Sequence, residues 1–301
     1  MSEQKWQRSS LRHLMDEMAG LGYWVSHTTI ARLLGKMNYS LKANVKRLAG
    51  SDHPDRNKQF EYIASQKVIF QQAGLPIISV DTKKKEWIGN FKNPGREWCL
   101  EARAVNDHDF EQDALGKPVP YGIYDLLHNH GYVYVGQSAD TPEFAVDVIA
   151  RWWREFGKSL FPNANKILIL ADAGGSNGCR PRLWKKQLQE LLADQLGLEV
   201  TVCHYPTGTS KWNPIEHRLF GPISTNWAAK PLLTFDFMLA CIRGTETDTG
   251  LKVDAFPVEK VYEKGIKVAK DVMQALFIEW HSTCPRWNYT IKPRQAPNLC
   301  L

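Results

Sequence analysis

Two short apolar segments of this chain each end on an aspartate. Residues 76–81 read Pro-Ile-Ile-Ser-Val-Asp, and residues 167–172 read Ile-Leu-Ile-Leu-Ala-Asp. Continuous apolar runs of this length predict strands that are buried on both faces. A third acid, Glu216, lies just inside a predicted helix. Carboxylates gathered at one edge of a sheet repel one another unless a cation binds there, and a divalent metal ion is the usual one. The pattern therefore indicates two-metal phosphoryl transfer on nucleic acid by Asp81, Asp172 and Glu216.

The order of the predicted elements favours a ribonuclease H-like α/β fold. Apolar patterns predict strands at residues 76–83, 86–92, 131–136, 166–171 and 198–204. Helices are predicted at 142–156, at 181–196 and around Glu216, after an earlier helix at 57–73. Three strands that can pair antiparallel, followed by strand–helix alternation, predict a mixed sheet flanked by helices. The strands of Asp81 and Asp172 can then be parallel neighbours, whose carboxylates meet at the carboxyl edge where such sheets bind ligands.

The N-terminal region carries most of the net positive charge. Of the formal net charge of +6, residues 1–60 contribute +5, from 10 Lys and Arg against 5 Asp and Glu. Helices are predicted after Ser10 and after Ser26, separated by a glycine-containing turn, which is the helix-turn-helix pattern. The second helix would present Thr28, Thr29 and Arg32 to base edges and phosphates. The basic residues Lys42, Lys46 and Arg47 follow. An ordinary helical hairpin with a solvated basic face is the alternative.

These patterns divide the chain into four parts. We expect a helix-turn-helix DNA-binding module at 1–50, a linker and helix at 51–73, a catalytic domain at 74–240, and a C-terminal extension packed on that domain at 241–301. Six scattered cysteines without a C-x-x-C pair argue against a zinc site or a disulfide scaffold. There is no signal peptide pattern and no apolar run of the roughly 20 residues that a membrane helix needs, so we expect a cytoplasmic protein that does not contact membrane.

The chemistry of phosphodiester cleavage explains why acidic side chains are the candidate catalytic residues. Two divalent ions can activate the attacking oxygen, neutralise the phosphate and stabilise the leaving oxygen, so the protein need only supply fixed oxygen ligands. Asp81 is the expected bridging ligand, Asp172 would complete one metal site, and Glu216 the other. Two of the acids have structural alternatives. Asp172 could be a turn residue, and Glu216 could be the third residue of a helix capped by Asn213.

Several polar residues near the acids are candidates for contact with DNA. The glycine-rich segment 174–178 lacks the spacing of a dinucleotide or phosphate-binding loop, but it contains two side chains that could donate hydrogen bonds to phosphate. Lysines follow Asp81 directly, and strand alternation would place two of them on its face. A solvated strand end is the equal alternative. The candidates at the acidic site are Lys83, Lys85, Ser176, Asn177, Lys211, His217 and Arg218.

Longer motifs extend these observations to most of the chain. They include Ser-Val-Asp-Thr-Lys-Lys-Lys-Glu at 79–86, Ala-Asp-Ala-Gly-Gly-Ser-Asn-Gly at 171–178, Gly-Thr-Ser-Lys-Trp-Asn at 208–213, and Ile-Glu-His-Arg-Leu-Phe at 215–220. Together, from about residue 9 to 291, the chain resembles the DDE transposases of Azoarcus-type bacterial insertion sequences, the Rhodopirellula-type family. The resemblance implies that Asp81, Asp172 and Glu216 form the acidic triad of a ribonuclease H-like domain.

The resemblance also implies a cofactor and a partner. The expected cofactor is Mg²⁺, for which Mn²⁺ can substitute, with two ions bound when DNA is present. The expected partner is double-stranded DNA, both the element ends and the target. A homo-oligomer on DNA is expected, and the N-terminal module is expected to be a truncated form of a longer one. Two other functions stay open. One is a ribonuclease H-like nuclease without strand transfer, and the other is a catalytically silent DNA-binding protein from a truncated element.

Overall fold

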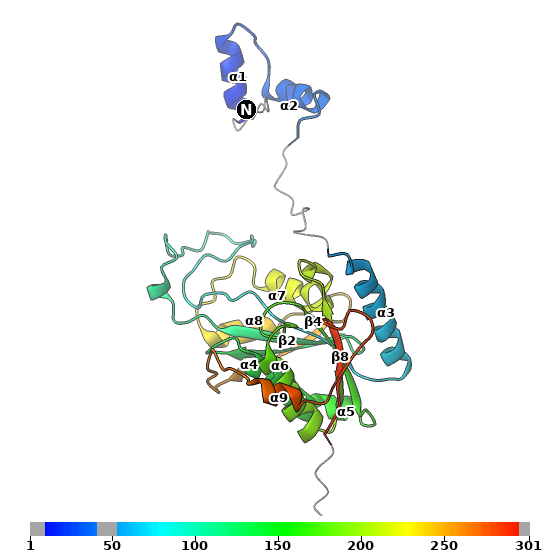
Figure 1. Ribbon diagram of the computed structural model, residues 1–301. Coiled ribbons are helices and arrows are strands. Elements are labelled where there is room, and N and C mark those ends of the chain that lie inside the picture. The colour runs from blue at the N-terminus through cyan, green and yellow to red at the C-terminus, as the bar shows by residue number, and fades with distance from the viewer. Residues whose placement is uncertain (1–9, 41–52, 295–301) are drawn as a thin grey trace, which may run out of the picture. The chain divides into compact units, whose positions relative to one another are not determined.

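The computed structural model describes residues 10–40 and 53–294 (Figure 1). The chain separates into two compact units, with the division between Ala49 and Gly50. The predicted basic residues Lys42, Lys46 and Arg47 lie outside the described residues. Each unit is considered by itself.

The first unit contains two ten-residue helices, α1 (Leu11–Gly20) and α2 (His27–Lys36). Both predicted N-caps are confirmed. The Ser10 hydroxyl accepts a hydrogen bond from the His13 backbone N–H at 3.1 Å, and the Ser26 hydroxyl accepts one from the Thr29 N–H at 3.2 Å. Such caps satisfy N–H groups that have no partner within a helix. The helices and the turn between them are therefore present, and their role as a DNA-binding motif stays a prediction.

The second unit is built on one eight-stranded mixed sheet with the order β6-β3-β2-β1-β4-β5-β8-β7. β1 pairs antiparallel with β2 and parallel with β4, β2 pairs antiparallel with β3, and β4 pairs parallel with β5. These five strands have the predicted ribonuclease H-like arrangement. The strands are β1 (Ile77–Thr82), β2 (Val119–Asp125), β3 (His130–Gly136), β4 (Lys166–Asp172), β5 (Glu199–Tyr205), β6 (Lys252–Val258), β7 (Ile278–Trp280) and β8 (Asn288–Ile291).

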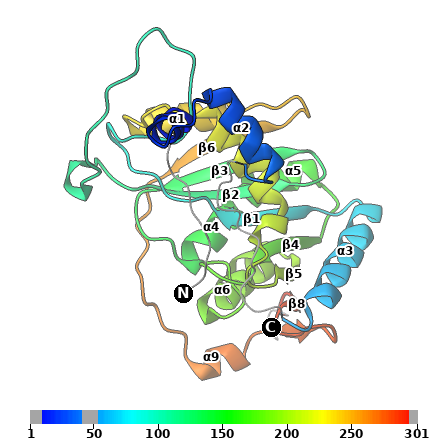
Figure 2. The ribbon, with the colours of Figure 1, turned by 90° about the horizontal axis from the view of Figure 1, so that it is seen from above.

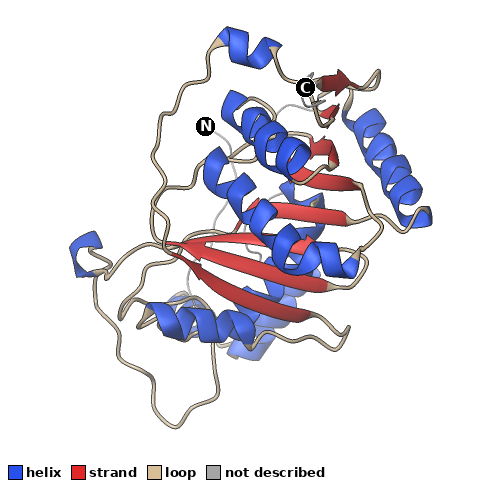
Figure 3. Cartoon of the chain, turned by 90° about the horizontal axis from the view of Figure 1, so that it is seen from below, coloured by secondary structure: helices blue, strands red, loops and turns tan. Residues whose placement is uncertain are grey.

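Helices cover both faces of the sheet (Figure 3). α4 and α6 pack on one face, and α3, η5, α7 and α8 on the other. The helical segments of this unit are α3 (Arg56–Gln72), η1 (Glu111–Asp113), α4 (Pro142–Trp152), η2 (Trp153–Gly157), α5 (Lys158–Leu160), α6 (Arg182–Gln187), η3 (Leu188–Gln195), η4 (Ser210–Trp212), η5 (Glu216–Phe220), α7 (Gly221–Asn226), α8 (Phe235–Arg243) and α9 (Lys270–Gln274). Among the described residues, no helix is both long and apolar enough to cross a membrane.

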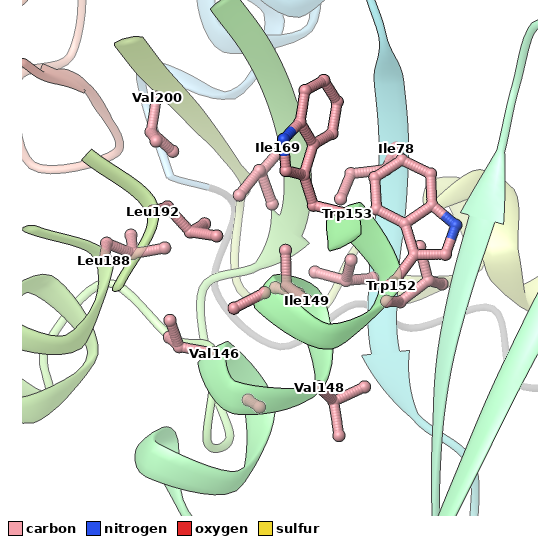
Figure 4. Close-up of a cluster of buried hydrophobic side chains, with 14 of the residues drawn as sticks. Ile78, Val146, Val148, Ile149, Trp152, Trp153, Ile169, Leu188, Leu192 and Val200 are labelled. Atoms are coloured by element: carbon pink, nitrogen blue, oxygen red, sulfur yellow. The ribbon is translucent and has the colours of Figure 1, made fainter. Parts of the chain in front are cut away.

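The largest apolar cluster lies under α4. Ile149 and Trp152 of this helix pack toward Ile78 of β1 and Ile169 of β4, with Leu192 of η3 beside them (Figure 4). All five side chains are fully buried. Each such burial contributes roughly 1.5 to 3 kcal/mol. This cluster fixes the positions of the two central strands that end on Asp81 and Asp172.

One predicted strand is wrong. Residues 86–92 form no strand, and only Ile88 makes an isolated bridge, to Gly116. Ile88 and Phe91 are nevertheless buried, so their apolar pattern reflects a packed loop rather than a strand. The strand between β1 and β3 is instead β2, in a segment where the sequence pattern predicts no strand. Pro120 and Gly122 explain why the sequence did not predict this strand, because both residues are uncommon inside strands.

The residues after 240, expected as an extension packed on the catalytic domain, supply three strands of the sheet. β6 pairs parallel with β3 at one edge. At the other edge β8 pairs antiparallel with β5, and β7 pairs with β8. None of these three strands was predicted. Together they cover the β3 and β5 sides of the central strands, whose backbone groups would otherwise be open to pairing with another chain.

Candidate active site

Asp81 and Asp172 lie on neighbouring parallel strands. In the β1–β4 pairing the last registered pair is Val80 with Ala171, and each aspartate is the next residue of its strand. Both carboxylates therefore stand at the carboxyl edge of the sheet, which is the arrangement that the sequence predicts. Both side chains are partly buried.

Glu216 reaches the same edge because η5 packs closely on β2. Gly122 of β2 is registered opposite Asp81. A Cβ atom at position 122 would lie 2.6 Å from Phe220 Cε1 and 2.9 Å from Ile215 Cδ1, so only glycine leaves room for the helix at this point. Glu216 lies between these two residues in the chain and is partly buried. The glycine that obscured β2 in the sequence thus lets the Glu216 helix approach Asp81.

Asn213 ties the Glu216 helix to the two strands. Its side-chain Nδ2 donates a hydrogen bond to Asp172 Oδ1 at 3.0 Å, and its Oδ1 accepts one from the Ser79 hydroxyl at 2.5 Å. The same hydroxyl accepts a hydrogen bond from the Ile215 N–H at 3.1 Å. Ser79 and Asn213 are fully buried. This network fixes the orientation of the Asp172 carboxylate.

The capping box that was the structural alternative for Glu216 is absent. The Asn213 backbone N–H donates to the Ser210 carbonyl at 2.8 Å, so it is not free for the Glu216 carboxylate. The Asn213 side chain is committed to Ser79 and Asp172 instead of the helix terminus. Within the described part of the chain, no hydrogen bond holds the Glu216 carboxylate. A structural role in capping therefore does not account for this acid.

Burial and mutual repulsion make the three acids weaker than usual. Burial raises the pKa of Asp81 well above its usual range, and the nearby charges of Asp172, Glu216 and Asp140 raise it further. Burial raises the pKa of Asp172 to about 6, with Glu216 adding to the rise and the Asn213 hydrogen bond opposing it. Burial also raises the pKa of Glu216, while Lys83 lowers it. A site that raises the pKa of three neighbouring carboxylic acids is electrostatically prepared to bind cations.

Two lysines lie close to the acids. Lys83 is buried, with Nζ 4.7 Å from the centroid of the Trp227 ring, and burial lowers its pKa. Lys85 is directed to Asp140, with 3.5 Å between Nζ and Oδ2, and Asp140 also accepts a hydrogen bond from the Thr82 hydroxyl at 3.2 Å. Sequence reasoning missed Asp140, because it precedes a helix on a different part of the chain and follows no apolar strand.

A buried histidine, His204, is hydrogen-bonded to the backbone at the end of β4. His204 Nδ1 lies 3.0 Å from the Asp172 carbonyl oxygen, which can only accept, so Nδ1 carries the proton. Its Nε2 then accepts from the Tyr289 hydroxyl at 3.2 Å, and this hydroxyl accepts from Trp184 Nε1 at 2.9 Å. Burial lowers the pKa of His204 to about 3, so the ring stays neutral. The backbone of Asp172 is therefore fixed as well as its carboxylate.

The other residues that were predicted to contact DNA differ in their burial and in their hydrogen bonds. Ser176 and Asn177 are buried, and their side-chain polar atoms have no hydrogen-bond partner among the described residues. His217 is exposed, with Nε2 hydrogen-bonded to the Lys211 carbonyl, and Arg218 is exposed. Lys211 Nζ lies 4.0 Å from the centroid of the Trp212 ring. Thr28, Thr29 and Arg32 belong to the first compact unit, where the two threonine hydroxyls bond to Ser26.

Comparison with known proteins settles the family. Residues 1–293 match the family model described as the Rhodopirellula transposase DDE domain. The chain belongs to this family. It is therefore an enzyme of the polynucleotidyl transferase class, and the resemblance inferred from its motifs is confirmed. No curated protein sequence matches the chain.

Solved structures of one transposase are similar in fold. They include the Mos1 transposase paired-end complex with left transposon end (14% identity, TM-score 0.47, covering 78% of this chain and 71% of that one) and the Mos1 strand transfer complex (15%, 0.46, 79% and 69%). The Mos1 mariner paired-end complex with Mn has 14% identity and a TM-score of 0.44, and covers 80% of this chain and 76% of that one.

The acids of this transposase suit the divalent metal that its family implies. Among the described residues, no three His, Cys, Asp or Glu side chains form a closed ligand set for one ion. Mg²⁺ does not need such a set, because it binds through one or two carboxylates and completes its shell with waters and substrate phosphates. An all-oxygen donor set with raised pKa values and one buried lysine fits that mode.

Proposed function

We propose that this transposase cleaves DNA at the ends of an insertion sequence and joins the freed 3′ ends to target DNA in a Mg²⁺-dependent reaction. One observation carries the proposal, namely that three separate segments bring Asp81, Asp172 and Glu216 to one edge of the sheet without a matching set of cations. A stable fold gains nothing from such repulsion. The arrangement is useful when cations and a phosphate enter the site.

Asp81, Asp172 and Glu216 would hold the divalent ions. When bound, such ions acidify the attacking hydroxyl and neutralise the charge that develops on the phosphate and the leaving oxygen. The protein then contributes position. Asn213 orients the Asp172 carboxylate, and His204 fixes the backbone from which that carboxylate projects. Lys83, whose charge acts on Glu216, would supply a positive charge for a phosphate at this site.

The partner would be double-stranded DNA, both the element ends and the target. The helices α1 and α2 would form a helix-turn-helix module whose second helix reads DNA through Thr28, Thr29 and Arg32. Thr28 and Arg32 are exposed. Strand transfer at two ends requires two active sites, so we propose that the enzyme acts as a homo-oligomer on DNA. Mn²⁺ would substitute for Mg²⁺ in the same ligand set.

Strand transfer into a supercoiled plasmid tests this function. The substrate is a labelled duplex made from the DNA that flanks the coding sequence, with a free 3′ end, and the reaction is run with Mg²⁺ or Mn²⁺. Joined products with wild-type protein, and none with Asp81→Asn, are expected. Cleavage without joining would instead identify a nuclease of the same fold. DNA binding with no cleavage under any metal would overturn the enzymatic proposal and favour a catalytically silent binding protein.

A further inference from the structure

A hollow of about 340 Å³ outside the acidic site carries two arginines. It is lined by Cys179, Arg180, Trp280, Pro285 and Arg286. Neither arginine, nor Trp280, was among the residues predicted to contact DNA. The hollow joins two segments that are far apart in the sequence, namely the loop that follows β4 and the turn between β7 and β8.

The sheet topology places this hollow at the same edge as the acids. β8 is antiparallel to β5, and its first residue, Asn288, is registered opposite Cys203 near the carboxyl end of β5. The turn that precedes Asn288 therefore lies at the carboxyl edge. The β4 loop returns to this edge as well, since the Cys179 N–H donates to the Ala173 carbonyl at 3.2 Å. Three strand spacings separate β1 from β8, which is about 14 Å.

Arg180 and Arg286 are exposed, and within residues 10–40 and 53–294 neither forms a hydrogen bond or an ion pair. Two other arginines of this unit, by contrast, are engaged in contacts with the protein. Arg182 donates to the Val268 carbonyl at 3.1 Å, and Arg294 pairs with Asp194 at 2.6 Å. Two unengaged guanidinium groups facing one hollow repel each other, and an anion that bridges them would relieve the repulsion.

The remaining lining is suited to a nucleic acid. Trp280 is 50% exposed, although its ring packs against Tyr289 with 5.5 Å between centroids. An exposed indole beside arginines is a usual surface for a base or a deoxyribose. An adjoining hollow of about 320 Å³ shares Pro285 and Arg286 and adds His53 and Asp55. Asp55 makes that second hollow less cationic, so we place the phosphate between Arg180 and Arg286.

The turn that carries Arg286 is held by the network that holds the acidic site. The Asn288 amide donates to the Thr283 carbonyl at 2.8 Å and to Gln59 Oε1 at 2.6 Å. Gln59 Nε2 donates in turn to the His204 carbonyl at 2.9 Å. His204 also bonds to the backbone of Asp172. Hydrogen bonds through Asn288, Gln59 and His204 therefore connect the turn that carries Arg286 to the backbone of Asp172.

We propose that this hollow binds backbone phosphates of the DNA strand next to the cleavage point, with Arg180 and Arg286 as the phosphate ligands and Trp280 against the adjacent sugar or base. The proposal rests on the proposed function, because it takes the acids as the point of cleavage. DNA lying across the carboxyl edge would then meet the metal ligands first and this hollow about two strand spacings beyond Asp172.

Salt-dependent DNA binding tests the proposal. The probe is a fluorescent mixed-sequence duplex of about 30 base pairs, and its affinity is measured by anisotropy at several salt concentrations in Ca²⁺. The test protein is the double variant Arg180→Gln with Arg286→Gln. Its matched control, Arg154→Gln with Lys158→Gln, removes the same charge from exposed residues at the amino end of β4. Loss of two phosphate contacts should weaken binding about tenfold and reduce the salt slope by about 1.8 relative to the control.

Three further results decide the matter. Arg180→Lys with Arg286→Lys should bind more tightly than the glutamine pair, because charge is kept while the bidentate geometry is lost. If the glutamine pair binds like its control while wild-type protein cleaves DNA, the hollow is not a DNA site and the proposed function stands. If wild-type protein binds no DNA in this assay, both proposals are overturned.

Discussion

Two aspartates each end a strand, at opposite ends of the strands of the sheet, and they differ in how the protein compensates their charge. Asp125 ends β2, and Asp172 ends β4. Asp125 is fully buried, but its Oδ1 accepts from the Leu127 and His128 N–H groups at 2.9 and 3.3 Å, and its Oδ2 lies 2.7 Å from His128 Nδ1. Its partners, Leu127 and His128, lie two and three residues further along the chain. This is the ordinary turn role of an aspartate after a strand.

Asp172 has no such local support. Among the described residues its carboxylate accepts one hydrogen bond, from Asn213, which is 41 residues away, and burial together with the charge of Glu216 raises its pKa. Burial and the end of a strand are common to both aspartates, so neither property identifies a functional acid. The difference lies in how the carboxylate charge is compensated. Hydrogen bonds from neighbouring residues compensate the charge of Asp125, whereas the described residues do not compensate the charge of Asp172 in this way.

The largest expected effect is on catalysis. Asp81→Asn and Asp172→Asn should each lower the rate of Mg²⁺-dependent DNA cleavage by roughly a thousandfold or more, because under the proposed function each removes the charge of a metal ligand. Asp125→Asn is the control and should leave the rate of the folded protein within a few-fold of wild type. The measurement is single-turnover cleavage, with folding checked by circular dichroism. Equal losses from Asp172→Asn and Asp125→Asn would remove the distinction between the two aspartates.

The effects on stability should have the reverse order, so that substitution of Asp125 lowers the free energy of unfolding more than substitution of Asp172. Asp125→Ala leaves two backbone N–H groups and the His128 ring without an acceptor, and we expect it to lower the free energy of unfolding by roughly 2 to 3 kcal/mol. Asp125→Asn keeps one acceptor oxygen and should cost about 1 kcal/mol. Asp172→Asn in EDTA should be neutral or stabilising, because it removes a repelled charge. Urea unfolding of the three variants makes the comparison, and strong destabilisation by Asp172→Asn alone would contradict it.

Local patterns were enough to predict the strands that carry the acids. The apolar runs of β1 and β4 and the predicted starts after Ser10, Ser26 and Asn213 depend on residues within a few positions of one another. β2 could not be found in this way. Pro120 and Gly122 break its pattern, and Gly122 is required only because Phe220, about a hundred positions later, packs against it.

The supports of the site could not be predicted either. The hydrogen bonds from Ser79 to Asn213 and from Gln59 to His204 span 134 and 145 residues. Asn213 was interpreted as a helix cap, because that is what an asparagine before a proline usually does. The strands β6 to β8 were not recognised, since β7 and β8 have only three and four residues and β6 contains Pro257, which argues against a strand. Sequence alone thus predicts which residues could be ligands, and tertiary contacts determine which of them are held in place.

The pH dependence of the unfolding free energy should also reveal the uncompensated charge of Asp172. In EDTA the pKa of Asp172 is about 6 in the folded state and near its usual value of 3.8 when unfolded. Between these values the folded state binds more protons, so this group lowers stability as pH rises and its full cost of roughly 2 to 3 kcal/mol is reached above about pH 7. The difference in unfolding free energy between Asp172→Asn and wild type should therefore grow from pH 4 to about pH 7. Mg²⁺ should reduce it. A difference that does not change with pH would show that Asp172 is compensated as Asp125 is.

The smallest effect concerns the hydrogen bond from Asn213 to the Asp172 carboxylate. Asn213→Ala should lower the cleavage rate about tenfold and weaken apparent Mn²⁺ affinity, because the Asp172 carboxylate loses its orientation and the Ser79 hydroxyl loses its acceptor. Ser79→Ala is the matched variant, since it removes the Ser79 hydroxyl from the network but leaves the Asn213 amide to donate to Asp172. It should cost similar stability and far less Mn²⁺ affinity. If the two variants weaken Mn²⁺ binding equally, Asn213 only holds the helix against the strand, and the orientation of Asp172 must come from the His204 side alone.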